Sequence, residues 1–91
     1  MDVVRLEKVE KQIKKLPLHI KVKLLEWASA VEMEGLTNIR MIKGYHDEPL
    51  SGSRVGQRSI RLSKAYRAIY VESRDGNINI VDVVKVSKHE Y

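Results

Sequence analysis

The sequence predicts an α+β domain in which an N-terminal helical hairpin packs on an antiparallel β-meander of three to four strands. Two observations predict this fold class. Apolar residues recur every three or four positions through the first third of the 91-residue chain, which is the period of an α-helix. Beyond Gln57 the apolar residues recur at every second position, which is the period of a β-strand.

The two helices are expected on either side of Pro17. The first apolar stripe consists of Leu6, Val9, Ile13 and Leu16, and the second consists of Ile20, Leu24, Trp27 and Val31. Pro17 stops the first helix and suits the first turn of the second, and Gly35 suits the position just after the last turn. Because Trp27 lies on the apolar stripe, we expect it in the core rather than stacked on a nucleic-acid base.

A long irregular connection is expected to follow the helices, and then the strands. Residues 36–57 are rich in glycine and serine and contain Pro49, and a connection this long in a small domain is often functional. Strands are predicted at residues 58–62, 65–71 and 78–86, the last two joined by a hairpin turn at Asp75-Gly76. Residues 87–91 are expected to form a polar tail.

The composition excludes several functional classes. Apolar residues make up 43% of the chain and charged residues 32%, which is typical of a globular protein. The chain contains no cysteine, which excludes disulfides, thiolate nucleophiles and cysteine-ligated metals. No apolar run approaches the roughly 20 residues of a membrane span, and the first residues do not resemble a signal peptide. We therefore expect a cytoplasmic protein without a membrane partner.

The charge distribution favours a polyanionic partner. Seventeen lysines and arginines against twelve carboxylates give a formal net charge of +5. The stretch from Pro49 to Arg67 has no carboxylate and five cations, which are Arg54, Arg58, Arg61, Lys64 and Arg67. Arginine binds a phosphate through two parallel hydrogen bonds, which lysine cannot do, so we interpret this stretch as the functional side of the molecule.

Arg67 is unusual because it interrupts an otherwise apolar central strand. One interpretation is an ion pair, for which the candidate partners are Glu48, Glu72 and Asp82. The other is that Arg67 lines an exposed sheet face and receives an anion. Ser59 and Arg61 favour the second interpretation, because they share one face of the adjoining strand and bring a second guanidinium close to Arg67.

The histidines provide one candidate acid or base. Histidine changes its charge near neutral pH, so His89 suits proton transfer, although a histidine this close to a terminus is often a bystander. His19 is expected to be structural. The run His46-Asp47-Glu48 tempts a metal assignment, but three contiguous loop residues rarely converge on one ion. We therefore expect no metal and no cofactor.

Motifs in the second half of the chain are similar to those of a known family. Gly44–Gly52 with its Glu-Pro-Leu-Ser-Gly segment, Gly56–Arg61 and Tyr66–Tyr70 together resemble the RelE/ParE toxin superfamily, in the branch of YoeB and HigB-like ribosome-dependent mRNA interferases. The resemblance implies that residues 1–91 are a single RelE-like toxin domain of a type II toxin–antitoxin system, with any initial strand confined to residues 1–6. It implies two partners, a cognate antitoxin and mRNA on the ribosome.

The resemblance also implies roles for individual residues. Glu48 corresponds to the base that deprotonates the RNA 2′-hydroxyl, Arg67 to the group that stabilises the phosphate, and His89 to the acid that protonates the leaving oxygen. Tyr91 corresponds to a tyrosine that follows the histidine, although Glu90 stands between them here. The expected RNA and phosphate contacts are Arg54, Arg58, Arg61 and Lys88.

Three alternatives remain open from the sequence. The chain is also compatible with a non-catalytic basic module that binds RNA or the ribosome. The chain could also be a ParE-like toxin, which has the same fold but acts on DNA gyrase. Such toxins lack the catalytic acid and base, so the presence of Glu48 and His89 argues against this alternative. A purely structural interaction protein would leave the arginine-rich stretch unexplained.

Overall fold

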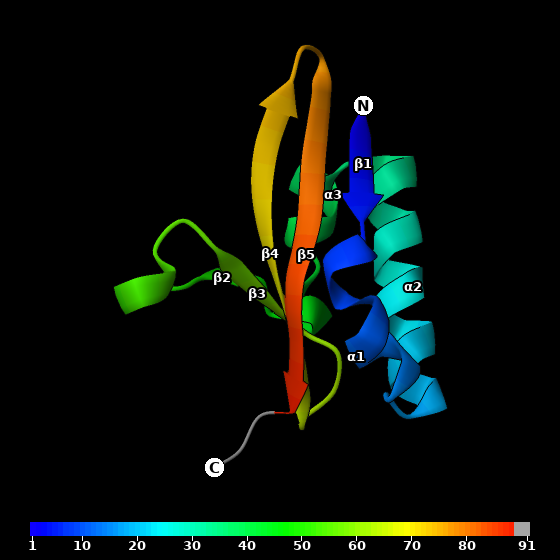
Figure 1. Ribbon diagram of the computed structural model, residues 1–91. Helices are drawn as coiled ribbons and strands as arrows, with labels where there is room; N and C mark the ends of the chain where they lie inside the picture. Colours follow the sequence, from blue (N-terminus) through cyan, green and yellow to red (C-terminus); the bar gives the residue numbers. More distant parts are fainter. Residues whose placement is uncertain (89–91) are drawn as a thin grey trace.

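The computed structural model describes residues 1–88, in which helices pack on one side of a five-stranded sheet (Figure 1). The regular elements are β1 (Asp2–Arg5), α1 (Glu10–Lys14), α2 (Leu18–Glu34), α3 (Leu36–Arg40), β2 (Glu48–Pro49), β3 (Arg58–Arg61), β4 (Tyr66–Asp75) and β5 (Ile78–Lys88). Short 3-10 turns are formed by Glu7–Val9, Lys43–Tyr45 and Gly52–Arg54.

The sheet is mixed, which corrects the expected antiparallel meander of three to four strands. Its strand order is β1-β5-β4-β3-β2, and β1 runs parallel to β5 while the other pairs are antiparallel. The α+β class itself is confirmed. The periodicity did not predict β1 and β2, which have four and two residues, too few for an alternating pattern to show, although the resemblance had confined any initial strand to residues 1–6.

The helical hairpin is also only partly present. Residues 6–16, expected as one helix, form a 3-10 turn and the five-residue α1. The helix is interrupted at Val9, which has φ −115° and is fully buried. The second helix agrees with the prediction, since Pro17 precedes its first residue and Gly35 follows its last with φ +88°, a conformation that favours glycine.

The core lies between α2 and the sheet. One stripe of α2 is buried, and the sheet residues that share its core are Ile60, Ala68, Tyr70, Val81 and Val83. Trp27 is 1% exposed and its ring centroid lies 5.5 Å from that of Tyr70, so its prediction as a core residue is confirmed. This contact fixes α2 over the middle of β4.

The β4–β5 hairpin is the longest feature of the sheet. Its turn lies at Gly76, as predicted, where φ is +60°, and Asp75 pairs with Ile78 across the turn. A bulge near Ile69 offsets the register. Ser87 and Lys88 continue β5 opposite β4, so they do not belong to the polar tail in which they were expected. Among residues 1–88, no helix is long and apolar enough to cross a membrane.

Two neighbouring leucines of α2 provide a test of this packing. Leu24 is fully buried and Leu25 is 51% exposed. We expect Leu24→Ala to lower the free energy of unfolding by about 2–5 kcal/mol, because it leaves a cavity. Leu25→Ala should cost less than about 1 kcal/mol. Urea denaturation followed by circular dichroism measures both values, and equal losses would show that α2 is rotated from the position described.

Candidate active site

The two faces of the sheet differ in what covers them. On β4, Ala68 and Tyr70 point toward the helices and are fully buried. Because side chains alternate along a strand, Arg67 and Ile69 point to the opposite face. No helix within residues 1–88 covers that face, which we call the open face (Figure 1).

Polar side chains from four adjacent strands meet on the open face. The open-face cluster consists of Glu48 on β2, Ser59 and Arg61 on β3, Arg67 on β4 and Lys85 on β5. The register brings them together: Glu48 lies opposite Ser59, Arg61 opposite Arg67, and Lys85 opposite Ile69. The prediction that Ser59 and Arg61 share one face of their strand is therefore confirmed.

Arg67 forms an ion pair with Glu48. Its Nη1 lies 3.2 Å from Glu48 Oε1, and the same nitrogen lies 3.5 Å from the Oγ of Ser59. The Glu48 side chain is 48% exposed and that of Arg67 is 27% exposed. Of the candidate carboxylates, Glu48 is thus the partner, but the pair is open to solvent rather than sealed in the core. A ligand can reach both groups.

Cations outnumber carboxylates in the open-face cluster. Arg61 and Arg67 face each other across β3 and β4, and like charges in that position destabilise a sheet. Glu48 offsets only one of them. The side chain of Arg61 makes no hydrogen bond or ion pair with another residue of the described part of the chain. The cluster therefore has the charge and the arrangement to bind an anion of phosphate size.

A buried carboxylate holds β2 in place from the other face. The Asp47 side chain is 1% exposed and accepts a hydrogen bond from the Tyr70 hydroxyl at 2.5 Å and one from Arg58 Nε at 2.6 Å. Arg40 Nε lies 3.9 Å from the same carboxylate. Because consecutive strand residues point to opposite faces, anchoring Asp47 toward the helices directs Glu48 to the open face.

Tyr70 stays neutral in this arrangement. Burial, and then the hydrogen bond to Asp47, raise the pKa of the Tyr70 hydroxyl well above its ordinary value. The raised pKa stabilises the fold at any pH below about 10, where an unfolded tyrosine is also neutral, and that contribution is lost as the pH rises further. The Tyr70 hydroxyl is thus a hydrogen-bond donor to Asp47 across the physiological range.

The other predicted site residues lie in different places. Arg58 binds Asp47 on the helix side, so it is not part of the open-face cluster. Arg54 donates a hydrogen bond to the side chain of Gln57 at 2.7 Å, within the connection between β2 and β3. Lys88 is exposed and lies opposite Tyr66 at the end of β5. His89 and Tyr91 lie outside the described residues.

Within residues 1–88, no three histidine or carboxylate side chains gather where they could hold a metal ion. His46, which the sequence places beside Asp47 and Glu48, has a left-handed backbone with φ +50°. Asp47 and Glu48 point to opposite faces of the sheet, so the three side chains do not converge.

Sequence reasoning missed the groups that support the site. Asp47 was considered only as a metal ligand and Tyr70 only as part of a motif, and Lys85 was not considered. A signal for Asp47 existed, since a residue next to Glu48 on a strand must point to the other face. Lys85 had a weaker signal, because its place on the open face depends on the bulge near Ile69.

Comparison with solved structures identifies the fold. A YoeB/ParE toxin from Agrobacterium tumefaciens is 18% identical with a TM-score of 0.68, and the alignment covers 98% of each chain. The toxin–antitoxin complex RelBE2 from Mycobacterium tuberculosis is 23% identical with a TM-score of 0.64 and 96% of each chain covered. YafQ from E. coli is 15% identical with a TM-score of 0.64, covering 98% of this chain and 92% of YafQ.

No protein-family model matches the sequence, and no curated protein sequence is significantly similar to it. The similarity thus lies in the arrangement of helices and strands over nearly the whole chain rather than in sequence identity. With its helices on one face of a sheet of order β1-β5-β4-β3-β2, this chain has the fold of the RelE/ParE/YoeB/YafQ toxin superfamily.

Proposed function

We propose that this protein is the toxin of a type II toxin–antitoxin system and a ribosome-dependent mRNA endoribonuclease. The observation that carries the proposal is the solvent-accessible ion pair between Glu48 and Arg67, beside Arg61 on the open face. A carboxylate next to two guanidinium groups combines a general base with phosphate binding. The resemblance of the motifs around Glu48 and Arg67, and the toxin fold of the chain, support the same function.

The proposed reaction needs only groups of the protein and the RNA. Glu48 takes the proton of the 2′-hydroxyl, whose oxygen attacks the adjacent phosphorus. The bond from phosphorus to the 5′-oxygen breaks, and that oxygen accepts a proton from His89. Arg67 and Arg61 stabilise the charge that develops on the phosphorane. The products are a 2′,3′-cyclic phosphate and a 5′-hydroxyl.

The role of His89 as the acid rests on the resemblance, since His89 lies outside the described residues. Ser87 lies opposite Arg67, and the described chain ends at Lys88, one residue before His89. The last described residues of β5 therefore lie beside the strand that carries Arg67. Tyr91 is proposed as a further contact to the RNA, with Lys88, Arg54 and the exposed part of Arg58 as phosphate contacts outside the open-face cluster.

An antitoxin is the expected protein partner. The Mycobacterium tuberculosis structure is a toxin–antitoxin complex, and a YoeB–YefM complex from Staphylococcus aureus, 17% identical to this chain, has a TM-score of 0.57. An acidic antitoxin segment laid over the open-face cluster would neutralise its excess positive charge and exclude the mRNA. Such a partner would make the toxin inactive until the complex dissociates.

The first prediction concerns the base and the phosphate-binding arginine. We expect Glu48→Gln to slow mRNA cleavage by about 10²–10⁴-fold, because the amide cannot accept the 2′-hydroxyl proton. Arg67→Ala should slow cleavage by about 10²–10³-fold through loss of transition-state stabilisation. Mapping the 5′ ends of a transcript in a translating extract measures both effects.

Matched controls separate this loss from a general change of charge. Glu10→Gln on α1 and Arg74→Ala at the far end of β4 change exposed residues away from the cluster and should cleave at the wild-type rate. If the wild-type protein bound the transcript but produced no cleaved product, the protein would instead be a basic RNA-binding module. Loss of DNA supercoiling activity by gyrase in the presence of the protein would favour a ParE-like toxin.

The second prediction concerns the nucleophile. A transcript with a single 2′-deoxynucleotide on the 5′ side of the cleavage position should resist cleavage there, because the attacking hydroxyl is missing. The unmodified transcript should yield a 2′,3′-cyclic phosphate, detected by mass spectrometry of the 5′ fragment. Cleavage of the deoxy substrate with a 5′-phosphate product would contradict the proposed mechanism.

The third prediction concerns Asp47 as a positioning residue. Asp47→Asn leaves Arg58 without its buried charge partner and Arg40 with Glu72 alone, so we expect a loss of about 3 kcal/mol in unfolding free energy. In the folded variant the cleavage rate at saturating mRNA should fall about tenfold, because Glu48 is no longer held against Arg67. Binding of the transcript should change little, since Arg61 and Arg67 remain.

Asp75→Asn is the control, since Asp75 is exposed at the β4 turn. It should leave both the denaturation midpoint and the cleavage rate unchanged. If Asp47→Asn lowered stability but cleaved at the wild-type rate, Asp47 would serve only the fold.

A further inference from the structure

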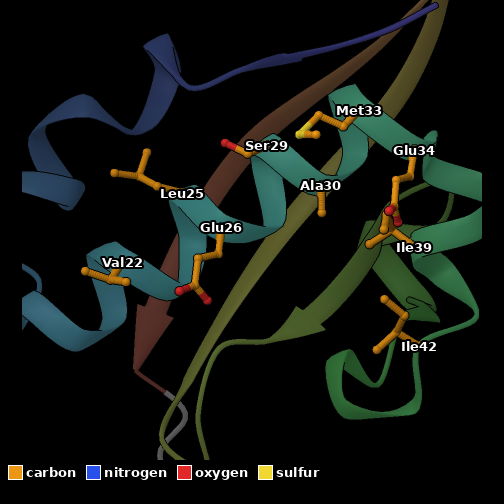
Figure 2. Close-up of a pocket in the computed structure, with 9 residues that line it drawn as sticks. All are labelled: Val22, Leu25, Glu26, Ser29, Ala30, Met33, Glu34, Ile39 and Ile42. Atoms are coloured by element: carbon orange, nitrogen blue, oxygen red, sulfur yellow. The ribbon is translucent and has the colours of Figure 1, made fainter.

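Two hollows in the surface share Ile42 as a lining residue. The first lies between α2 and the segment that carries Ile39 and Ile42, and it is lined mostly by apolar side chains (Figure 2). The charged residues that line it are Glu26 and Glu34, so this hollow is unsuited to a polyanion. The second hollow reaches Glu48 and therefore adjoins the candidate active site.

The second hollow, which we call the edge hollow, has a volume of about 520 Å³ and is lined by residues 40–43 and 46–48. Its lining includes both Asp47 and Glu48, whose side chains point to opposite faces of the sheet. Because β2 is the last strand in the sheet order, a hollow that reaches both faces lies beyond the outer edge of β2. The edge hollow therefore continues directly from the open-face cluster.

Most charged groups of the edge hollow already have partners. Arg40 is paired with Glu72, and the carboxylates of Asp47 and Glu48 each have an arginine partner. Lys43 is different, because within residues 1–88 its ammonium group forms no ion pair and donates no hydrogen bond. The edge hollow thus has one positive charge that is available to an anion.

His46 is fixed in the edge hollow by its neighbours in sequence. Tyr45 is 8% exposed and the side chain of Asp47 is 1% exposed, whereas His46 between them is exposed. The His46 amide donates a hydrogen bond to the Lys43 carbonyl at 3.0 Å, and φ is +50°, a conformation that glycine adopts at lower cost. In the described part of the chain the imidazole has no hydrogen-bond partner. The turn therefore holds Lys43 and His46 at one hollow and uses neither side chain in the fold.

Two exposed apolar side chains complete the lining. Met41 is 79% exposed and Ile42 is 46% exposed, and both lie next to Lys43 in the sequence. A thioether packs favourably against a flat aromatic ring, and a base needs an apolar surface of this kind. A positive charge beside such a surface suits a nucleotide, whose phosphate and base need different surroundings.

The role of Glu48 in the proposed reaction sets the direction of the RNA across the sheet. Glu48 takes the proton of the 2′-hydroxyl, so the nucleotide that carries this hydroxyl lies on the β2 side of the scissile phosphate. In an in-line displacement the leaving 5′-oxygen lies on the opposite side of the phosphorus. With the scissile phosphate at Arg67 on β4, the RNA runs in the 5′ to 3′ direction from β2 toward β5. The nucleotide before the cut is then the one beside the edge hollow.

We propose that the edge hollow binds the nucleotide on the 5′ side of the cleavage position. Lys43 and His46 contact the phosphate at the 5′ end of that nucleotide, which we call the upstream phosphate, and its base packs on Met41 and Ile42. This inference rests on the proposed function, since the direction of the RNA follows from the role of Glu48. It assigns Lys43 and His46 to substrate binding and not to proton transfer.

A thermodynamic cycle between Lys43 and the upstream phosphate tests this contact. The substrate is a transcript on stalled ribosomes, either unmodified or with one uncharged methylphosphonate in place of the upstream phosphate. Lys43→Ala and the methylphosphonate should each lower kcat/KM by about tenfold. Together they should lower it no further than either change alone, because both remove the same contact. Lys11→Ala, an exposed lysine on α1, is the control and should cleave both transcripts like the wild type.

A second transcript tests the direction of the RNA. It carries the methylphosphonate at the first phosphate after the cleavage position, which should lower cleavage by the wild type and by Lys43→Ala in the same proportion. If the effect of Lys43→Ala disappeared on this transcript instead, the RNA would run from β5 toward β2 and the proposal would be overturned. Independent, multiplicative effects on both transcripts would also overturn it, because Lys43 would then contact neither phosphate.

His46→Gly separates binding from folding at the left-handed position. Glycine accepts φ +50° without strain, so the variant should unfold at the wild-type temperature. The KM for the transcript should rise by about threefold to tenfold through loss of a hydrogen bond, with kcat unchanged because Glu48 and Arg67 are intact. His19→Ala, which removes an exposed histidine of α2, should leave both values unchanged. A lower unfolding temperature with the wild-type KM would show that the His46 side chain serves only the fold.

Failure of this inference is distinguishable from failure of the proposed function. If the wild type cleaves, Glu48→Gln does not, and Lys43→Ala and His46→Gly cleave with wild-type kcat and KM, then only the nucleotide site in the edge hollow is wrong. If the wild type cleaves no transcript on the ribosome, the proposed function is wrong and the assignment of the edge hollow fails with it.

Discussion

The candidate site depends on one buried charge, the carboxylate of Asp47. Strand β2 has only two residues and cannot hold its own position by backbone pairing alone. Asp47 replaces that missing support with a hydrogen bond from Tyr70 and an ion pair with Arg58. Tyr70 is itself fixed against Trp27 in the core. The position of Glu48 is thus determined by the packing of α2 on β4, through a short chain of contacts.

The alternation of side chains along a β-strand then places the supporting carboxylate and the solvent-exposed carboxylate on different faces of the sheet. Consecutive residues point to opposite faces, so Asp47 and Glu48 are adjacent in sequence but serve different sides of the sheet. The same division applies to β3, where Arg58 neutralises the buried carboxylate and Arg61 faces solvent beside Arg67. A shift of one residue in the register of β2 would exchange the two carboxylates and remove the ion pair with Arg67.

Much of the fold and the centre of the site were predictable from the sequence. Long periodic segments such as α2 and β4 were predicted because many residues share one pattern, and Arg67 was conspicuous because a charge interrupts an apolar strand. The periodicity did not predict β1 or β2, since two to four residues carry no measurable period. The ion pair of Arg58 was not predicted because its partner, Asp47, lies just outside the carboxylate-free stretch and meets it only through strand pairing. Contacts of that kind depend on register, which local sequence does not specify.

The resting ion pair between Glu48 and Arg67 is compatible with catalysis because it is weak. Both side chains are partly exposed, and ion pairs of this type contribute about 0–1 kcal/mol. A phosphate that replaces Glu48 as the partner of Arg67 offers charge-assisted hydrogen bonds to Arg61 as well, which a single carboxylate does not. In the proposed reaction, binding of the RNA would therefore cost little in broken contacts, and it would release a carboxylate already placed beside the phosphate. The excess of positive charge on the open face is unfavourable in the free protein. The same excess favours the replacement of Glu48 by a phosphate as the partner of Arg67.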